Sequence, residues 1–324
     1  MLRIHFTAED LIRTRVAASA DPLWEIVLSL HTLQARHCPR VFQKWSREIR
    51  GRIGKHRNPG LLAHLLPLTP IASYRPDFLT PSETIGNLAA GIDAVMSTPP
   101  SRLRRELQQL SSISRLPTWS DELAAGKPEQ LRVLGSALRD YHQVALAPYW
   151  KDIREQVDLD RMARGQILLD GGPERLLETL SPQSSWRRPV LEVRYPVDRS
   201  LHLDGRGLML VPSFFCSTYP ITLADTTLPP VLVYPIPQAG FPPDRAHGGL
   251  SALLRPTRVA MLIAARPGRS TTGLARLLNM SPSTVSYHAS VLRAADLITS
   301  RRYANVMLHT TTQLGITLLR GRDH

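Results

Sequence analysis

The sequence predicts an α+β protein in which a mostly helical amino-terminal domain with a small antiparallel sheet precedes a carboxy-terminal domain of helices and one β-hairpin. Three observations carry this prediction. Apolar residues recur at helical spacing through most of residues 1–185, apolar and polar residues alternate within 186–240, and helical spacing returns after residue 250. We therefore expect one domain over 1–240, with its helices in 1–185 and its sheet in 186–240, and a second over 250–324.

Breaks between the helices of the first domain are set by proline and glycine. Asp21 followed by Pro22 is typical of a capped helix start. A long helical pattern over residues 129–170 must break or kink at Pro148, because proline lacks the backbone N–H of a helix interior. Gly171, Gly172 and Pro173 should end that pattern and begin a shorter helix.

The expected sheet contains two kinds of strand. Residues 191–195 alternate in polarity, which predicts a half-buried strand, whereas 231–234 form a continuous apolar run that should be covered on both faces. Asp204-Gly205 predicts the turn of a hairpin over 202–208. Residues 237–249 are rich in proline and glycine and are the expected linker between the domains.

Two capped helices follow in the second domain. Ser270 can cap a helix whose Leu274, Leu277 and Leu278 share one face, and Asn279 tolerates the left-handed conformation needed where that helix stops. Ser281 caps the next helix, with Pro282 at its first position.

The second of these helices has an inward and an outward face. Val285, Ala289 and Leu292 repeat at the spacing of one buried stripe. The opposite face carries small hydroxyls and one tyrosine but no carboxylate, which suits a helix lying in the major groove of DNA. The alternative is an ordinary helical hairpin with a polar face.

A β-hairpin with a basic tip comes next. Residues 297–300 and 306–310 are prone to form strands and are joined by residues 301–305, which contain two arginines and a tyrosine. A helix is expected before the helical pair, over 256–265, and another after the hairpin, over 312–319. This order of helices and hairpin is that of a winged helix-turn-helix.

The winged helix-turn-helix predicts a DNA contact surface. The residues expected at base edges or adjacent phosphates are Ser281, Ser283, Thr284, Ser286, Tyr287, His288 and Ser290. Those expected on the DNA backbone from the wing are Arg301, Arg302 and Tyr303. A module that binds another protein is a further possibility, but the arginines at the tip disfavour it.

Residues 250–320 resemble the ArsR/SmtB-type winged helix-turn-helix regulators. The resembling segments are 271–275, 281–288 and 291–298. Segments 4–7, 21–25, 147–150, 203–207 and 211–215 resemble the long amino-terminal domain, of unknown function, of an actinobacterial branch of that family. The resemblance implies a transcriptional regulator, most simply a repressor, that binds double-stranded DNA. Because one recognition helix reads only a few base pairs, we expect a homodimer on an inverted repeat. Asp296 departs from the family's usual glycine, and the metal-sensing Cys-x-Cys is missing.

Charge and cysteine usage agree with this interpretation. The net charge is +13, and residues 245–324 hold 11 arginines, no lysine and 2 aspartates, so most of the excess lies in the second domain, where it attracts phosphate. The two cysteines, Cys38 and Cys216, make no disulfide framework. No apolar run is long enough for a membrane span, and no signal peptide is apparent. We expect a soluble cytoplasmic protein without metal or cofactor.

The first domain offers little recognisable chemistry. It has no nucleophile elbow and no phosphate-binding loop, which disfavours the alternative of an enzyme that carries the winged helix as an accessory. A small organic effector is an open possibility. Tyr141, His142, Tyr149 and Trp150 are the candidate lining of its pocket, with packing in a helical core as the competing interpretation.

Overall fold

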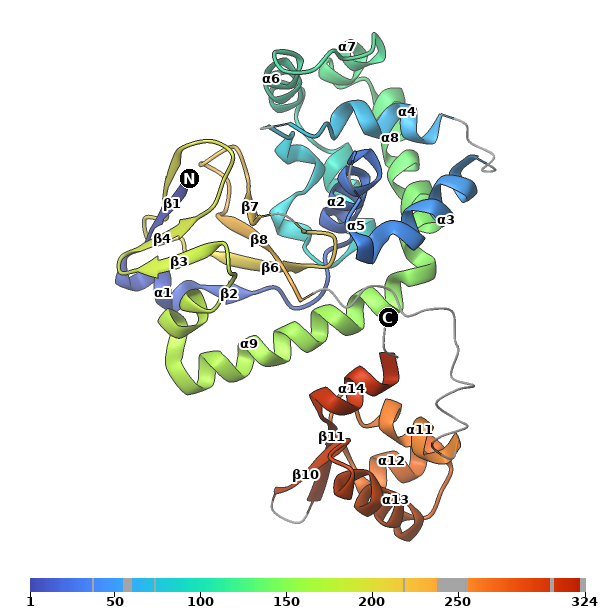
Figure 1. Cartoon of the computed structure of the whole chain (residues 1–324). Helices are drawn as coiled ribbons and strands as arrows, with labels where there is room; N and C mark the ends of the chain where they lie inside the picture. Colours follow the sequence, from blue (N-terminus) through green and yellow to red (C-terminus); the bar gives the residue numbers. More distant parts are fainter. Residues whose placement is uncertain are drawn as a thin grey trace. The chain divides into compact units, whose positions relative to one another are not determined.

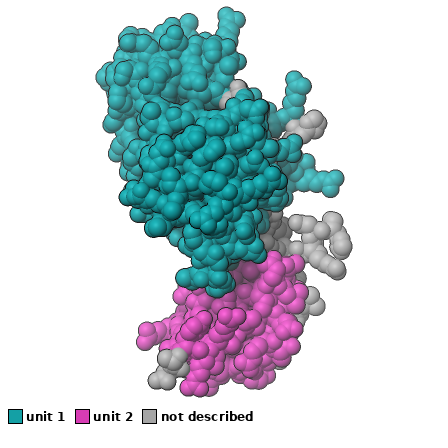
Figure 2. Space-filling view, turned by 90° about the vertical axis from the view of Figure 1, so that its left-hand side faces the viewer, with its two compact units in different colours: residues 1–241 teal, residues 242–324 magenta. Residues whose placement is uncertain are grey.

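The computed structural model describes residues 1–36, 38–54, 60–72, 74–217, 219–237, 254, 256–303 and 306–320. The chain forms two compact units, unit 1 over 1–241 and unit 2 over 242–324 (Figure 1, Figure 2). Nearly all of the linker expected over 237–249 lies outside the described residues. Within the described part of the chain, every helix is too short or too polar to cross a membrane.

Helix α2 (Pro22–Gln34) is the most deeply buried helix of unit 1. Its first turn forms as expected, because the Asp21 side chain accepts a hydrogen bond from the backbone N–H of Trp24 and Pro22 stands at the first position. The other helices of unit 1 are α1 (Ala8–Arg13), α3 (Gln43–Gly54), α4 (Leu61–Leu65), α5 (Leu88–Met96), α6 (Pro100–Ser111), α7 (Trp119–Ala124), α8 (Pro128–Tyr141) and α9 (Trp150–Glu178).

The long helical stretch after residue 128 breaks where proline and glycine predict. Between α8 and α9 the chain forms a π-helical turn (His142–Leu146) and a 3₁₀ turn (Ala147–Tyr149) that contains Pro148. Inside α9, Gly172 has φ +71° and is followed by Pro173, so the helix is interrupted there. Both predicted breaks are confirmed.

Unit 1 contains two four-stranded sheets, each of mixed direction. In the first, the order is β3 (Ser184–Arg187), β4 (Val190–Val193), β1 (Leu2–His5) and β5 (Arg199–His202), and β1 is parallel to β5. In the second, the order is β2 (Arg15–Val16), β6 (Met209–Ser213), β8 (Val231–Pro235) and β7 (Ile221–Thr222). Strand β6 is parallel to both of its neighbours, and β7 is antiparallel to β8.

The prediction of one small antiparallel sheet within 186–240 is wrong. The amino-terminal segment supplies a strand to each sheet, and β1 lies between β4 and β5. Asp204 and Gly205 do form a turn, with φ +54° and +82°, but β5 and β6 on either side belong to different sheets. An Asp-Gly turn reverses the chain locally and does not decide which strands pair, so the predicted hairpin is absent.

Glu25 joins helix α2 to the second sheet. Its carboxylate is fully buried and accepts hydrogen bonds from the backbone N–H groups of Phe214 and Phe215, at 2.7 and 3.0 Å, and from the hydroxyl of Ser213, at 3.1 Å. Burial raises the pKa of Glu25 to about 7. This one side chain therefore satisfies two backbone donors directly after β6.

Unit 2 is built from helices packed on a small sheet. Its elements are α11 (Pro256–Ala264), β9 (Arg269–Ser270), α12 (Thr271–Leu278), α13 (Pro282–Ala294), β10 (Ile298–Tyr303), β11 (Val306–Thr311) and α14 (Gln313–Arg320) (Figure 1). The strands form an antiparallel sheet in the order β10, β11, β9. The core that holds these elements together includes Met261, Leu262, Leu274, Val285, Ala289 and Leu292.

Candidate nucleic-acid interface

Helix α12 begins and ends as its sequence indicates. The Ser270 hydroxyl accepts a hydrogen bond from the backbone N–H of Gly273 at 3.0 Å, and Asn279 adopts the left-handed conformation with φ +51°. Leu274 is buried and Leu278 is half-buried. Leu277, however, is 54% exposed, so its predicted inward position is wrong. Helix α12 has only eight residues and buries only a narrow face. The side chain of Leu277, three residues after Leu274, lies outside that buried face.

Helix α13 presents one buried and one open face. Its start is capped by Ser281, whose hydroxyl accepts a hydrogen bond from the backbone N–H of Thr284 at 3.1 Å. Val285, Ala289 and Leu292 are each at most 2% exposed, which confirms the predicted inward stripe. The burial of this stripe against the core of unit 2 fixes which side chains the helix turns outward.

The open face of α13 consists of hydroxyl groups and one aromatic ring. Ser281, Ser283, Thr284, Ser286, Tyr287 and Ser290 are exposed, and His288 is half-buried. Tyr287 is 60% exposed, a large ring that contributes little to the core. The hydroxyls of Ser283 and Thr284 each lie 2.8 Å from that of Ser281. Because a helix amino terminus carries unpaired N–H groups and a positive dipole end, this cluster suits a phosphate or base-edge acceptor.

The predicted wing hairpin is present, with its arginines within a strand rather than in the turn. Arg301, Arg302 and Tyr303 are exposed residues of β10, and they pair with Leu308, Met307 and Val306 of β11. Successive strand residues point to opposite faces, so Arg301 and Tyr303 share one face of the hairpin and Arg302 lies on the other. Residues 304–305, at the tip, lie outside the described residues.

The connection from α13 to the wing uses Asp296 in a left-handed conformation, with φ +55°. The backbone N–H of the next residue, Leu297, donates a hydrogen bond to the carbonyl of Leu292 at 2.9 Å. Aspartate thus adopts the left-handed conformation at the position where the resembling family usually has glycine, in keeping with the ability of aspartate to do so.

His309 links the wing to helix α12 and was not singled out by the sequence. Its side chain is buried, with Nε2 2.9 Å from the Thr271 hydroxyl and Nδ1 2.8 Å from the Ser300 hydroxyl. Burial, and secondarily the charge of Arg293, lowers the pKa of His309. No local pattern could identify it, because its two partners lie 38 and 9 residues away.

We expect unit 2 to lose stability as the pH falls below about 6.5, the ordinary pKa of histidine. The folded state resists protonation of His309 while the unfolded chain accepts the proton, so its contribution is present above that pH and is lost below it. Hydrogen exchange of residues 256–320, corrected for the intrinsic rate at each pH, measures this. The stability of unit 2 should depend less on pH in His309→Gln than in the wild type. An unchanged dependence on pH would refute the role given to His309.

The candidate ligand residues of the first domain lie where α8 passes into α9. Tyr141 is fully buried with its hydroxyl 3.0 Å from that of Ser29, and the Tyr149 hydroxyl donates to Glu48. His142 and Trp150 contact each other edge to face. These contacts fit the competing interpretation of packing in a helical core, whereas the Nε2 of His142 is buried without a hydrogen-bond partner among the described residues. Among the described residues, no group of three or more His, Cys, Asp or Glu side chains is arranged to hold a metal ion.

Comparison with known proteins places the helix-turn-helix in a family. Residues 255–300 match the family described as "Bacterial regulatory protein, arsR family". The chain therefore carries an arsR-family helix-turn-helix domain, a regulatory DNA-binding domain. Unit 1 lies outside this match.

A solved structure is also similar to part of the chain. The crystal structure of NolR from Sinorhizobium fredii is 30% identical over a match that covers 22% of this chain and 72% of that one, with a TM-score of 0.19. Comparison with functionally curated proteins gave no match.

Proposed function

We propose that this chain is a cytoplasmic transcriptional repressor, without catalytic activity, that binds double-stranded DNA as a symmetric homodimer. The observation that supports this most is the open face of α13, which lies in an arsR-family domain. This face carries hydroxyl groups and one tyrosine, and α13 contains no aspartate or glutamate. Such a face can contact base edges and phosphates without repelling the DNA backbone.

The homodimer follows from the small size of one recognition helix. A single helix reads only a few base pairs, so specificity requires two half-sites separated by roughly 34–36 Å, and twofold symmetry of the protein then matches an inverted repeat. Helix α14 is one candidate interface, because it exposes Leu314 and Leu318. Unit 1 is the other.

Selection from random DNA tests the proposal. The full chain is incubated with a random duplex library, retained DNA is sequenced, and the best sequence is footprinted. We expect an enriched inverted repeat with both halves protected. A library that yields no enriched sequence, or protection of a single asymmetric half-site by a monomer, would refute the proposal.

Replacing Tyr287 by alanine should weaken binding to the selected DNA by about 1–3 kcal/mol, the usual contribution of a good base contact. The ring is 60% exposed and lies outside the core, so stability should change by no more than about 0.5 kcal/mol. Titration of labelled DNA measures affinity, and Tyr287→Phe separates the hydroxyl from the ring. Wild-type affinity in Tyr287→Ala would remove this residue from the interface.

Arg301→Ala and Arg302→Ala should instead weaken binding to all sequences alike. A contact to phosphate releases a bound counterion, so each loss should reduce the slope of log affinity against log salt by about 1. Arg132→Ala, an exposed arginine of unit 1, is the matched control and should leave the slope unchanged. If the wing variants also keep the wild-type slope, the wing does not touch the backbone.

A further inference from the structure

The net positive charge of unit 1 is concentrated in one short stretch of the chain. Residues 36–57 contain eight arginines and lysines and a single acidic residue, Glu48. The rest of residues 1–241 contains 21 basic and 23 acidic residues, so it has almost no net charge of its own. The described part of the basic stretch includes a 3₁₀ turn (Arg40–Phe42) and helix α3, which lies at the edge of the helical part of unit 1 (Figure 1).

The 3₁₀ turn and α3 together have one apolar and one basic side. The large apolar side chains are buried in the core of unit 1: Phe42, Trp45 and Ile49. Arg40, Lys44 and Arg47 are exposed and follow one another at positions i, i+4 and i+7, so they form a row on the opposite side. Arg36, also exposed, precedes the turn. We call Arg36, Arg40, Lys44 and Arg47 the basic face of α3.

Most of the basic face is not used by the fold. Arg36, Arg40 and Arg47 make no hydrogen bond or ion pair with any residue that the structure describes. Lys44 lies 3.9 Å from the carboxylate of Glu48, a distance at which an exposed pair contributes little. Like charges one helical turn apart repel each other, so the row destabilises α3 unless an anion lies over it.

Two neighbouring arginines show the contrast, because their side chains do serve the fold. Arg50 donates hydrogen bonds to the carbonyl of Leu33 and, at 3.3 Å, to the hydroxyl of Ser46. The guanidinium of Arg52 lies over the ring of Tyr149, 5.6 Å from its centre. The folding of unit 1 therefore accounts for Arg50 and Arg52 but not for the basic face.

Gly51 lies one helical turn after Arg47 on the same exposed side of α3. A Cβ atom added there would meet no atom within 4 Å, so packing inside unit 1 does not require a glycine. Glycine is a poor helix former and gives no packing in return at this position. The missing side chain leaves the helix backbone open to a ligand that approaches closely.

We propose that the basic face of α3 is a second DNA contact, which binds backbone phosphates of the DNA that unit 2 recognises. Arg40 and Arg47 are separated by roughly 10–12 Å along the helix, a length over which one DNA strand presents about three phosphates. Guanidinium groups suit this partner, because they donate paired hydrogen bonds to phosphate oxygens. The choice of DNA as the polyanion rests on the proposed function.

An anionic membrane is the competing partner, and the structure favours DNA. A helix that lies on a membrane buries apolar side chains among the lipids beside its basic ones. Here Phe42, Trp45 and Ile49 already face the core of unit 1, and the basic face carries no large apolar side chain. A purely charged surface is what sequence-independent contact with a phosphate backbone requires.

The basic face is expected to act only together with unit 2. A few phosphate contacts alone hold DNA weakly, and the binding is lost as salt rises. When unit 2 holds the DNA, the linked unit 1 meets it at a high effective concentration, so the same contacts add to the affinity. Unit 1 without unit 2 should therefore leave the mobility of DNA unchanged at micromolar protein.

The salt dependence of DNA binding tests the proposal in the full chain. The variant replaces three arginines by glutamine: Arg36→Gln, Arg40→Gln and Arg47→Gln. Its slope of log affinity against log salt should be smaller by about 2–3 per chain, and its affinity at low salt should fall about tenfold or more. Selected and random duplexes should lose affinity alike, because phosphate contacts carry no sequence information.

A second triple variant controls for net charge. It makes the same change at three exposed arginines elsewhere in unit 1: Arg104→Gln, Arg115→Gln and Arg132→Gln. Its slope should stay within about 1 of the wild-type slope, because these positions lie outside the basic face. Both triple variants should melt at the wild-type temperature, since none of the six side chains makes a bond that the structure describes.

Gly51 gives an independent test of close approach. Gly51→Glu should lower affinity for both duplexes by about tenfold relative to Gly51→Gln, because the two side chains have the same size and differ in charge. Gly51→Gln itself should bind more weakly than the wild type if the DNA backbone comes close to α3. Equal affinity of the wild type, Gly51→Gln and Gly51→Glu would show that no DNA lies against this side of the helix.

The outcomes separate this proposal from the proposed function. If the chain binds its selected repeat and the triple variant of the basic face keeps the wild-type slope and affinity, the second contact is refuted and the proposed function stands. If no sequence is enriched but this variant still weakens binding to random duplex, the proposed function fails and the contact stands. Vesicles of phosphatidylserine and phosphatidylcholine complete the test. If the variant loses binding to the vesicles and not to DNA, the basic face serves a membrane and the proposal is wrong.

Discussion

Replacing Glu25 by alanine is expected to lower the free energy of unfolding of unit 1 by about 3–5 kcal/mol. The carboxylate is fully buried and serves the backbone N–H groups of Phe214 and Phe215. Alanine leaves both donors without a partner in a place that water does not reach, at about 1–3 kcal/mol each. The lost volume adds a cavity between α2 and the second sheet.

Tryptophan fluorescence during denaturant unfolding measures this effect on unit 1 alone. All five tryptophans lie in unit 1, at positions 24, 45, 119, 150 and 186. Glu83→Ala removes an exposed carboxylate in the same unit and should change the unfolding midpoint very little. If the two variants unfold at the same midpoint, Glu25 does not stabilise the packing of α2 against the second sheet.

Replacing Leu292 by alanine should cost unit 2 about 2–5 kcal/mol and abolish DNA binding. The side chain is 1% exposed and packs on the inner face of α13, in a small core shared by the helices and the wing. A unit of this size has little stability in reserve, so a cavity under the recognition helix should unfold much of the population.

Leu277→Ala is the matched control, since the same atoms are removed from a side chain that is 54% exposed. Hydrogen exchange of residues 256–320 reports the stability of unit 2, and titration with the selected DNA reports binding. Exchange should accelerate strongly in Leu292→Ala and hardly at all in Leu277→Ala. Equal protection in the two variants would contradict the packing described here.

The elements of unit 2 were predictable because their signals are local. Caps at Ser270 and Ser281, a left-handed Asn279 and a stripe of Val285, Ala289 and Leu292 each act within a few residues, and all are present in the structure. Leu277 was mispredicted because the spacing of apolar residues indicates which face of a helix is buried but not how wide the buried face is. The wing arginines were expected in a turn and lie in a strand, as strand propensity does not fix where a strand ends.

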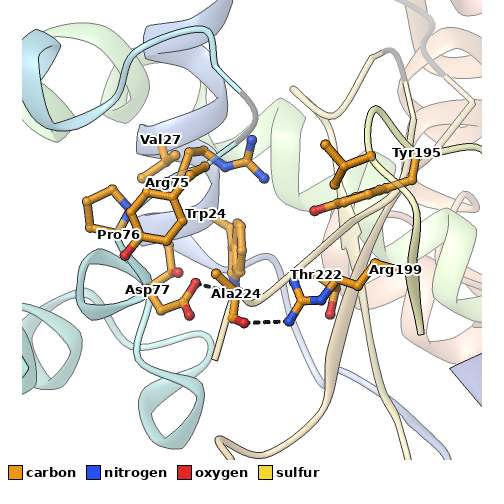
Figure 3. A pocket seen from close by; sticks show the side chains of 12 residues that line it. Trp24, Val27, Arg75, Pro76, Asp77, Tyr195, Arg199, Thr222 and Ala224 are labelled. Carbon is orange, nitrogen blue, oxygen red and sulfur yellow. Dashed lines mark hydrogen bonds between the residues drawn. The ribbon is translucent and has the colours of Figure 1, made fainter. Parts of the chain in front are cut away.

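The sheets of unit 1 were not predictable in the same way. Pairing of β1 with β4 and β5 joins residues nearly 200 positions apart, and no pattern in either segment indicates which strand it pairs with. A small cleft of unit 1 bordered by Trp24, Arg75 and Tyr195 could not be predicted for the same reason, because these residues come from three separate segments (Figure 3). The aromatic cluster from Tyr141 to Trp150 was the candidate visible in the sequence because its members are close together along the chain, and its described contacts lie within the helical part of unit 1.

The central claim is that DNA binding resides in unit 2. The most direct test measures the electrophoretic mobility of the selected DNA in the presence of a shortened chain that ends at residue 241. Unit 1 retains its own core in this shortened chain, so its fold can be verified by tryptophan fluorescence before DNA is added. We predict that the full chain retards the DNA and the shortened chain does not. Retardation by the shortened chain with wild-type affinity would contradict the claim.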